Sequence, residues 1–564
     1  MSTKFHTGFV LHQWRLKKGA GEIFGQHHLC VFFKRIVLGR PRAGTGFLPI
    51  LFCLCFVSLL GCTQKIKDCS VSEIPLSVYP DYNAATIPPN IAPLHFQIQE
   101  KGEKYHIEIF SCNGPKISLR QRSPIVKIPL KKWKRLLDEN RGNDLFIDVY
   151  IKNKKWVNYP IRALPIAPEP IDSTVVYRMI GVITTDDDKQ GIYQRNLYDF
   201  NVRTIFENTS TEGRSCVNCH SFIQNDPGKM SLHFRKAYPG TVFFDQGQIS
   251  KYNTKTPYTM SPGAYTAWHP SGRFIAFTTN RLFEFITSDF TKTVEVYDHA
   301  SDLVLYDLAL NSIVCDPLLA TPDRENLPEW SPDGKWLYYV SAPAVNPERS
   351  NLVGARYSLL RIPFDPETRQ WGKPDTLLTP DETGRSITFP KVSPDGRNLL
   401  FGMVDYGYFT IFDQNSDLYL FNLETFTYRA LDSINSSSAE GYHAWSKNGR
   451  WIVFSSKRGD QVRARPWFAY FDRQDKVHKP FVLPQEDPLF PEGTAWQLNR
   501  PVLVDGQIRF DPKDLHRVLD APPQPVGFIG DSTPDAFSGA TRLEMIAPQT
   551  PLAKEKKTAE QGKN

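Results

Sequence analysis

The sequence of 564 residues lacks the short motifs that define several large enzyme classes. It contains no Gly-rich phosphate loop, no Gly-x-Ser-x-Gly elbow and no His-Glu-x-x-His pair. Nothing in it therefore indicates a P-loop nucleotide site, a hydrolase nucleophile or a zinc protease centre. Cysteine and methionine are also scarce, with 9 and 6 residues.

Most of the chain has no excess of either acidic or basic residues. The formal net charge is +7, but removing the eight basic residues and the single acidic residue of positions 1–61 leaves 59 residues of each sign. The remainder is neutral and has no basic footprint, which argues against nucleic acid as a partner.

An apolar run near the start of the chain is too short to span a bilayer comfortably. Phe47–Leu60 has 14 residues and follows two arginines, as the apolar region of a signal peptide follows a basic region. It ends in Leu59-Leu60-Gly61-Cys62, which resembles the lipobox of bacterial lipoproteins. The resemblance implies a lipid on Cys62 and a location in the bacterial cell envelope, periplasmic or surface-exposed. The outer membrane is favoured because Thr63 is not the Asp of inner-membrane retention.

One stretch of residues dictates a chemistry, Arg214-Ser-Cys-Val-Asn-Cys-His-Ser-Phe222. A Cys-x-x-Cys-His sequence is the attachment motif of c-type haem. Cys216 and Cys219 are predicted to form thioethers with the haem, and His220 is predicted to be the proximal iron ligand. A redox dithiol would need a βαβ context and a zinc site a second ligand pair, and neither is present. We therefore expect one covalent haem c.

Four copies of another pattern follow this motif along the chain. They are Trp268-His-Pro-Ser-Gly-Arg-Phe-Ile-Ala-Phe277, Trp330-Ser-Pro-Asp-Gly-Lys-Trp-Leu-Tyr-Tyr339, Val392-Ser-Pro-Asp-Gly-Arg-Asn-Leu-Leu-Phe401 and Trp445-Ser-Lys-Asn-Gly-Arg-Trp-Ile-Val-Phe454. Each copy predicts a strand, a tight turn whose Gly tolerates positive φ, and a second apolar strand. The glycines are 62, 62 and 53 positions apart, a period typical of the blades of a β-propeller.

The copies resemble the repeat of the TolB-like (WD40-like) propeller family. The Ser-Pro-Asp-Gly turn of that family stands unaltered at Ser331–Gly334 and Ser393–Gly396, whereas the turns at 269–272 and 446–449 depart from it. The resemblance implies an architecture of about six blades and transfers no function. The haem segment, residues 214–236, can be laid on the same register, so we expect it to be inserted in a blade.

The predicted fold is therefore mostly β, an N-terminal β-sandwich followed by a TolB-like β-propeller. Short alternating strand signals carry the β-sandwich prediction. No Met lies between Met1 and Met179. The translation start within the long segment before the apolar run is therefore left open. The expected parts are a signal peptide at 1–61, a lipidated tether at 62–94, the β-sandwich at 95–170, the propeller at 171–510, and a Pro-rich and polar tail at 511–564.

The second axial position of the iron has two nearby candidates. Met230 lies 11 residues after Cys219, and a hairpin can bring it back over the iron. His233 is the alternative, and in a strand it points to the face opposite Met230. Methionine would give a comparatively high potential that suits electron transfer, histidine a lower one, and an open position would allow small-molecule chemistry. Met260, His269 and His443 are remoter candidates.

Together these features predict an envelope-anchored monohaem c-type cytochrome that acts in electron transfer or redox sensing. Its propeller would dock a redox or envelope protein partner. Two alternatives stay open, and with them the question of enzyme activity. One is a haem enzyme that acts on a small molecule at an open iron. The other is a non-catalytic lipoprotein that binds envelope proteins or glycans and carries a structural haem.

Overall fold

The computed structural model describes residues 66, 69–182, 189–210, 215–287, 292, 294–345, 354–490 and 494–530. The chain divides into two compact units, Met1–Lys65 and Ile66–Asn564, and every described residue belongs to the second. The predicted signal peptide and Cys62 lie outside the described residues. Within those residues, no helix has the length and apolar character needed to cross a membrane.

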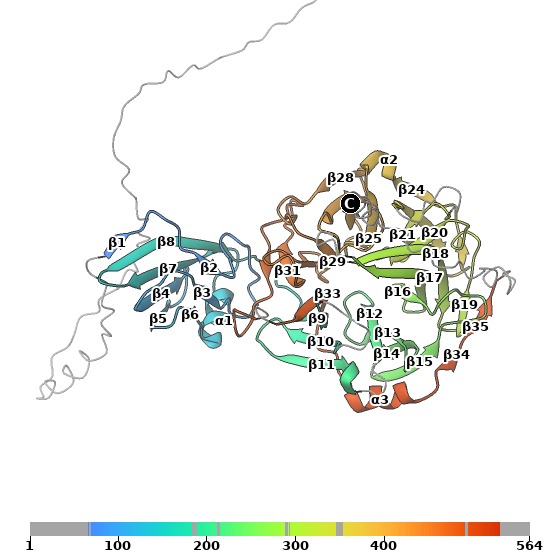
Figure 1. Ribbon diagram of the computed structural model, residues 1–564, viewed down its shortest axis with the longest axis horizontal. Coiled ribbons are helices and arrows are strands. Elements are labelled where there is room, and N and C mark those ends of the chain that lie inside the picture. Colours follow the sequence, from blue (N-terminus) through green and yellow to red (C-terminus); the bar gives the residue numbers. More distant parts are fainter. Residues whose placement is uncertain are drawn as a thin grey trace, which may run out of the picture. The chain divides into compact units, whose positions relative to one another are not determined.

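Six sheets, which we call blades 1 to 6, make up most of the second unit (Figure 1). Blade 1 contains β9 (Thr174–Gly181), β10 (Gly191–Asn196), β11 (Val202–Glu207) and β33 (Trp496–Val504). Blade 2 contains β12 (Cys216–Phe222), β13 (Lys229–Arg235), β14 (Gly240–Asp245) and β15 (Gln248–Asn253). Blade 3 contains β16 (Ala264–Trp268), β17 (Phe274–Ile286), β18 (Val294–Asp307) and β19 (Ser312–Val314).

The remaining blades follow the same plan. Blade 4 contains β20 (Arg324–Trp330), β21 (Trp336–Ala342), β22 (Ser358–Asp365), β23 (Gln370–Trp371) and β24 (Asp375–Leu378), and the short helix α2 (Pro380–Thr383) follows it. Blade 5 contains β25 (Ser386–Val392), β26 (Asn398–Val404), β27 (Asp417–Asn422) and β28 (Thr427–Ala430). Blade 6 contains β29 (Glu440–Trp445), β30 (Trp451–Ser456), β31 (Arg465–Tyr470) and β32 (Phe481–Val482).

The innermost strands of the blades lie side by side in sequence order, β12, β16, β20, β25, β29 and β33. The last of them, β33, comes from the C-terminal side and pairs antiparallel with β9, so it completes blade 1. The turn after β12 returns to this strand, since Asn225 Nδ2 donates to the carbonyl of Leu503 at 2.8 Å. These sheets confirm the prediction of a mostly β protein and are consistent with a β-propeller.

The repeated turns have the predicted conformation. Gly272, Gly334, Gly396 and Gly449 have φ of 71°, 74°, 73° and 65°, values that a residue with a Cβ adopts at a cost. In the turn of blade 4, Ser331 Oγ donates to Asp333 Oδ1 at 2.6 Å, and the same oxygen accepts the backbone N–H of Lys335. The Ser-Pro-Asp-Gly sequence therefore supplies both the hydrogen bonds and the backbone freedom of the turn.

In the region predicted as a β-sandwich, the strands form two sheets that share one apolar core. One sheet has the order β1 (Cys69–Val71), β8 (Trp156–Pro165), β7 (Asp144–Lys152), β4 (Lys104–Phe110) and β5 (Ile117–Gln121). The other has the order β2 (Val78–Tyr79), β3 (Phe96–Ile98) and β6 (Ile125–Val126), and helix α1 (Leu130–Asp138) buries Trp133 in the core. The same core continues into blades 1 and 6 through residues such as Val175 and Phe468.

The prediction of a tether at 62–94 is wrong over most of its length. From Cys69 onward the segment belongs to the folded body, because β1 pairs with β8 and β2 pairs with β3. Leu76, Tyr82 and Ile87 are buried in the shared core. The segment shows no periodicity, but its apolar side chains still find partners in two sheets that are distant in sequence.

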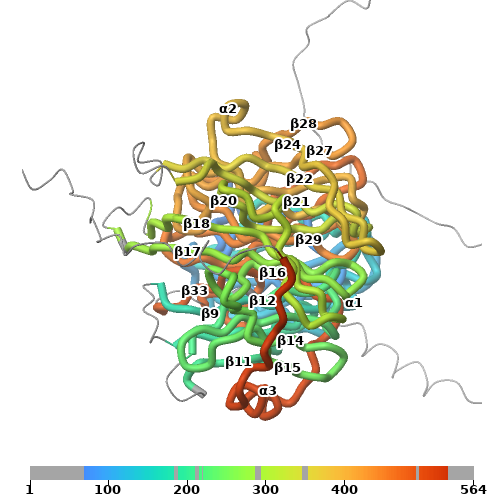
Figure 2. The backbone as a smooth tube through the Cα atoms, turned by 90° about the vertical axis from the view of Figure 1, so that its right-hand side faces the viewer, coloured from blue at the N-terminus to red at the C-terminus, as the bar shows by residue number. Residues whose placement is uncertain are grey.

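The prediction of an irregular tail from residue 511 is wrong for its first part. Helix α3 (Pro512–Asp520) buries Leu515 and Leu519, and β34 (Gln524–Pro525) and β35 (Gly527–Ile529) add parallel edges to blades 2 and 3. Figure 2 shows this segment, in red, passing in front of the strands of these blades. Residues 531–564 lie outside the described part of the chain.

Candidate functional site

The predicted haem motif lies in β12, the innermost strand of blade 2. The ladder between β12 and β13 is regular from Cys216 to Asn218 and resumes at Ser221, with a register shift between. Such a β-bulge re-aims the side chains of the residues that it contains. In β12 these two residues are Cys219 and His220.

The same bulge occurs in the innermost strand of every other blade. Register shifts leave out Tyr265-Thr266, Leu327-Pro328, Phe389-Pro390, Tyr442-His443 and Arg500-Pro501. The first residue of each of these pairs has a positive φ between 47° and 55°, a strained conformation for a residue with a side chain. All five pairs, together with His220, line one cavity. The haem motif thus supplies the blade 2 member of a ring of bulges.

This axial cavity has a volume of about 750 Å³ and is lined by all six innermost strands. Phe389 contacts Tyr442 at 5.3 Å between ring centroids and Tyr265 at 6.2 Å. The guanidinium of Arg500 lies 5.1 Å from the ring centroid of Tyr442 and 5.9 Å from that of Tyr265. Because the contacts of Phe389 and Arg500 with Tyr265 join blades that are not neighbours, the four side chains cross the axis, and cation–π attraction helps to hold them together.

The opposite part of the cavity is lined by the repeated turns and by charged side chains. Lys229 pairs with Asp245 at 3.0 Å, Lys447 pairs with Asp505 at 2.8 Å, and Lys391 pairs with Glu329. Burial raises the pKa of Glu329, although Lys391 opposes the shift. Four cationic side chains line the cavity, counting Arg500, with the two acids Asp226 and Glu329, and Asp245 and Asp505 neutralise two of the lysines, so the charges at the cavity balance.

His220 is buried in this lining with only 4% of its surface exposed. Within the described residues, neither ring nitrogen makes a hydrogen bond of good geometry, although the backbone of Arg500 and of Val176 lies close to the ring. Burial lowers its pKa to about 3, and the positive charges of Arg500 and Arg178 add to the shift, while the nearby backbone of Arg500 and Val176 opposes it. The imidazole is therefore neutral at physiological pH, with a nitrogen lone pair available to a metal.

The imidazole of His220 and the volume of the cavity fit a haem held by this histidine. The positions of the two cysteines do not show whether they form thioethers with it. Cys216 is buried, and its sulfur lies 3.7 Å from Gln190 Oε1 and 3.4 Å from Asn218 Nδ2. Cys216 does not line the cavity, so its side chain would have to turn to reach a haem there. The side chain of Cys219 lies outside the described part of the structure.

The two predicted distal ligands do not reach the cavity. Met230 is buried opposite Phe222 in an apolar cluster that includes Phe206 and Phe234. His233 pairs with Asn218 on the other face of β13, and burial lowers its pKa to about 3 with a contribution from Arg235. The structure thus agrees that they point to opposite faces, and neither lines the axial cavity.

Of the three remoter candidates for the second iron ligand, the two histidines make hydrogen bonds and the methionine lies outside the cavity lining. His269 Nε2 lies 3.0 Å from the carbonyl of Gly334 and its Nδ1 lies 2.8 Å from Ser271 Oγ, so both ring nitrogens are engaged. His443 lines the cavity, but its Nε2 donates to the carbonyl of Phe389 at 2.7 Å. Met260 is not part of the cavity lining.

The crossing residues Tyr265, Phe389, Tyr442 and Arg500 were not predicted as site residues. A signal for three of them exists in the repeats, because Tyr265, Phe389 and Tyr442 each stand three positions before the first residue of a copy. Leu327 has the same spacing. Without the bulge, which no hydropathy pattern reveals, this position would be assigned to an ordinary strand.

Neither known protein families nor curated proteins match this sequence. Solved structures of β-propeller proteins are similar in structure. A TolB homologue from Agrobacterium tumefaciens has 12% identity over 59% of this chain and 98% of its own, with a TM-score of 0.31. The propeller domain of the Trilobed protease from Pyrococcus furiosus has 12% identity over 62% and 96%, with a TM-score of 0.30. The tricorn protease has 10% identity over 66% and 38%, with a TM-score of 0.26. At these values the likeness carries no functional argument.

Proposed function

We propose that this chain is a monohaem c-type cytochrome whose haem is bound inside the propeller. One observation carries the proposal. His220 directly follows a Cys-x-x-Cys sequence and presents two buried ring nitrogens that make no hydrogen bond of good geometry, beside a cavity of about 750 Å³. A buried polar group without a partner costs free energy, and an iron ligand is a function that would repay the cost.

Each part of the site would have a separate task. Cys216 and Cys219 would hold the haem covalently, and His220 would be its proximal ligand. When bound, the haem would supply a one-electron redox centre. The side chains that cross the axis would exclude water from one end of the cavity, and the charges of Arg500 and Arg178 would favour the reduced state by opposing additional positive charge.

The wider role that we propose is electron transfer or redox sensing in the bacterial cell envelope. The lipobox-like sequence at Cys62 supports a lipid anchor, with the outer membrane favoured. The neutral charge balance of the chain after residue 61 supports a redox or envelope protein as the partner and argues against nucleic acid.

A second candidate is a haem enzyme that acts on a small molecule at an open iron. It is favoured by the positions of Met230 and His233, which lie outside the cavity lining. The other histidine of the cavity, His443, donates from Nε2 to a backbone carbonyl, which leaves only its Nδ1 free in the described part of the chain. An iron held by His220 would then have no protein ligand on its second axial side within the described residues.

Covalent haem content and the visible spectrum test both candidates. The full-length protein is produced with haem-maturation machinery, and we expect it to retain one haem after denaturation, with loss in Cys216→Ser and His220→Ala. Protein without covalent haem would overturn the proposal.

The spectrum then separates the two roles. Met230→Ala is compared with Met403→Ala, a methionine that is equally buried in blade 5. A low-spin spectrum that changes only in Met230→Ala would indicate an electron carrier. A high-spin spectrum that responds to carbon monoxide in all three proteins would indicate an open iron.

A further inference from the structure

A second cavity lies between blades 5 and 6, and no residue lines both this cavity and the axial one. Its volume is about 430 Å³. One wall is formed by strands β26, β27 and β28 of blade 5, and the other by residues 474–476, in the turn between β31 and β32. The cavity is therefore independent of the haem motif.

The blade 5 wall carries a row of three polar side chains. Asn398 pairs with Asn422, which pairs with Thr427, across three antiparallel strands. Residues paired in this way place their side chains on one face of the sheet. On the same face, Leu420 packs in an apolar cluster with Ile452 of blade 6. The polar row therefore faces blade 6.

Asn398 breaks the internal repeat of the propeller. It is the second residue after the glycine of its turn, and four other blades have an apolar residue there, Met230, Phe274, Trp336 and Trp451. Only 1% of the surface of Asn398 is exposed. A buried amide costs free energy unless its polar atoms have partners, so folding alone does not explain this residue.

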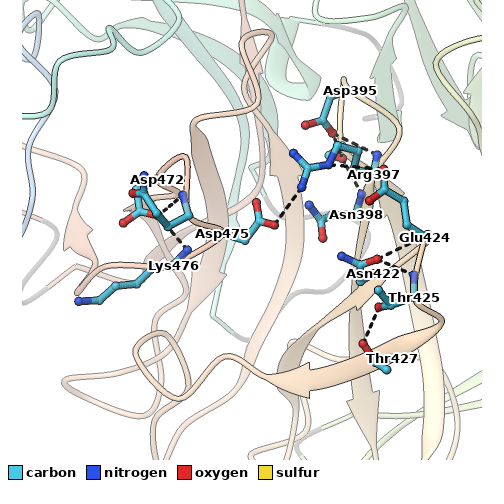
Figure 3. A network of polar contacts seen from close by, with 12 residues as sticks. Asp395, Arg397, Asn398, Asn422, Glu424, Thr425, Thr427, Asp472, Asp475 and Lys476 are labelled. Atoms are coloured by element: carbon cyan, nitrogen blue, oxygen red, sulfur yellow. Dashed lines mark hydrogen bonds and ion pairs between the residues drawn. The ribbon is translucent and has the colours of Figure 1, made fainter. Parts of the chain in front are cut away.

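The amide of Asn398 lacks one of its partners. Among the described residues, no acceptor lies within hydrogen-bond reach of Asn398 Nδ2. The neighbouring Asn422 uses its Oδ1 to accept the backbone N–H groups of Glu424 and Thr425 at 2.9 and 2.8 Å. Figure 3 shows the two amides side by side, with Asp475 across from Asn398. The unpartnered donor thus borders the space between the two walls.

The opposite wall is held in place before any ligand binds. Asp472 Oδ1 accepts the backbone N–H groups of Gln474 and Lys476, each at 2.9 Å. Arg397 of blade 5 donates to Asp475 Oδ2 at 3.3 Å (Figure 3). A preorganised wall reduces the entropy lost on binding.

The lining favours a ligand that both donates and accepts hydrogen bonds. Amide and hydroxyl groups offer both functions, the carboxylate of Asp475 accepts, and Arg429 and Lys476 donate. With one acidic and two basic residues, the lining has too small a net charge to favour a multivalent ion. Leu420, which also belongs to the apolar cluster with Ile452, adds apolar surface to the lining. We propose that this cavity binds a saccharide, whose hydroxyl groups match the polar row and whose C–H face matches the leucine.

Isothermal titration calorimetry on the full-length protein tests this proposal. The probes are cello-, laminari-, malto-, xylo- and chitotetraose, with inorganic sulfate as an anion probe. We expect saturable binding of at least one tetrasaccharide at one site. Asn398→Phe, which restores the apolar residue of the other repeats, should weaken the affinity at least about tenfold.

Two further variants separate binding from folding. Asp475→Ala changes the opposite wall, and Asp381→Ala is its control, an exposed acid on α2 that does not line the cavity. Asp475→Ala should weaken binding and Asp381→Ala should not, and Cys216→Ser should bind as the wild type does. No binding of any tetrasaccharide, binding of sulfate alone, or equal affinity in Asp475→Ala and the wild type would overturn the proposal.

Discussion

His220 in blade 2 and His443 in blade 6 occupy the same position of the repeated bulge, and their surroundings differ. Both are the second residue of the bulge pair, both are buried, and both line the axial cavity. His443 donates from Nε2 to the carbonyl of Phe389 and leaves Nδ1 without a partner, whereas neither nitrogen of His220 makes a hydrogen bond of good geometry within the described residues. One backbone position therefore holds a histidine that is anchored through Nε2 and another that is not anchored in this way.

The largest expected difference between the two histidines concerns haem. His220→Ala should lose nearly all covalent haem, because it removes the proposed proximal ligand. His443→Ala should retain haem at the level of the wild type. Haem content per protein, measured after denaturation, checks both, and equal loss in the two variants would contradict the assignment.

In haem-free protein, His443→Ala should lower the free energy of unfolding more than His220→Ala does. His443→Ala removes a hydrogen bond to a buried carbonyl and should lower the free energy of unfolding by about 2 kcal/mol. His220→Ala breaks no hydrogen bond of good geometry and opens onto an existing cavity, so it should lower it by less than about 1 kcal/mol. Urea unfolding of each variant, produced without haem-maturation machinery, makes the comparison without haem.

The pH dependence of stability should also report on His443. Burial lowers its pKa to about 4 in the folded protein, with Phe389 and Leu400 opposing the shift, against about 6.5 in the unfolded chain. The unfolded state therefore binds the extra proton between pH 6.5 and pH 4, so this contribution to stability is complete above pH 6.5 and is lost as the pH falls.

The full shift would correspond to about 3 kcal/mol as an upper bound. His443→Gln cannot titrate, and its unfolding free energy should fall less between pH 7 and pH 5 than that of the wild type. Parallel profiles of the two proteins would show that His443 does not titrate in this window.

The smallest effect concerns the reduction potential. Arg500 acts on His220, whereas Lys391 acts on His443. Removing a positive charge near the haem destabilises the reduced state, so Arg500→Gln should lower the potential by on the order of 50 mV. Lys391→Gln should change it less, because its charge is paired with Glu329. Spectroelectrochemical titration of the three proteins measures the difference.

The sequence repeats predicted the fold well because they encode local structure. The turns at Gly334 and Gly396 follow from residue types whose conformational preferences are strong. The position of β12 within a blade was predicted by aligning the haem segment with the same repeat. By contrast, β1, β2, β34 and β35 have two or three residues each, and segments this short carry no periodic signal.

The site could be predicted only in part, for a related reason. Cys216, Cys219 and His220 form a contiguous motif, and their type and spacing are visible in the sequence. The distal side depends on how the bulge of β12 aims its side chains and on what each face of β13 packs against in the neighbouring blades. Met230 fills an apolar cluster, a common role for a flexible thioether side chain.

The pairing of β33 with β9 also sets an order of events during the proposed export. Val502 and Val176 are partners in this ladder, so the ring cannot close until residue 504 has crossed the membrane. Contacts between residues so distant in sequence form late in folding. The strand that carries Cys216 is complete much earlier. An attachment enzyme would therefore meet its substrate as an open chain of blades, and closure of the last blade would seal the product inside.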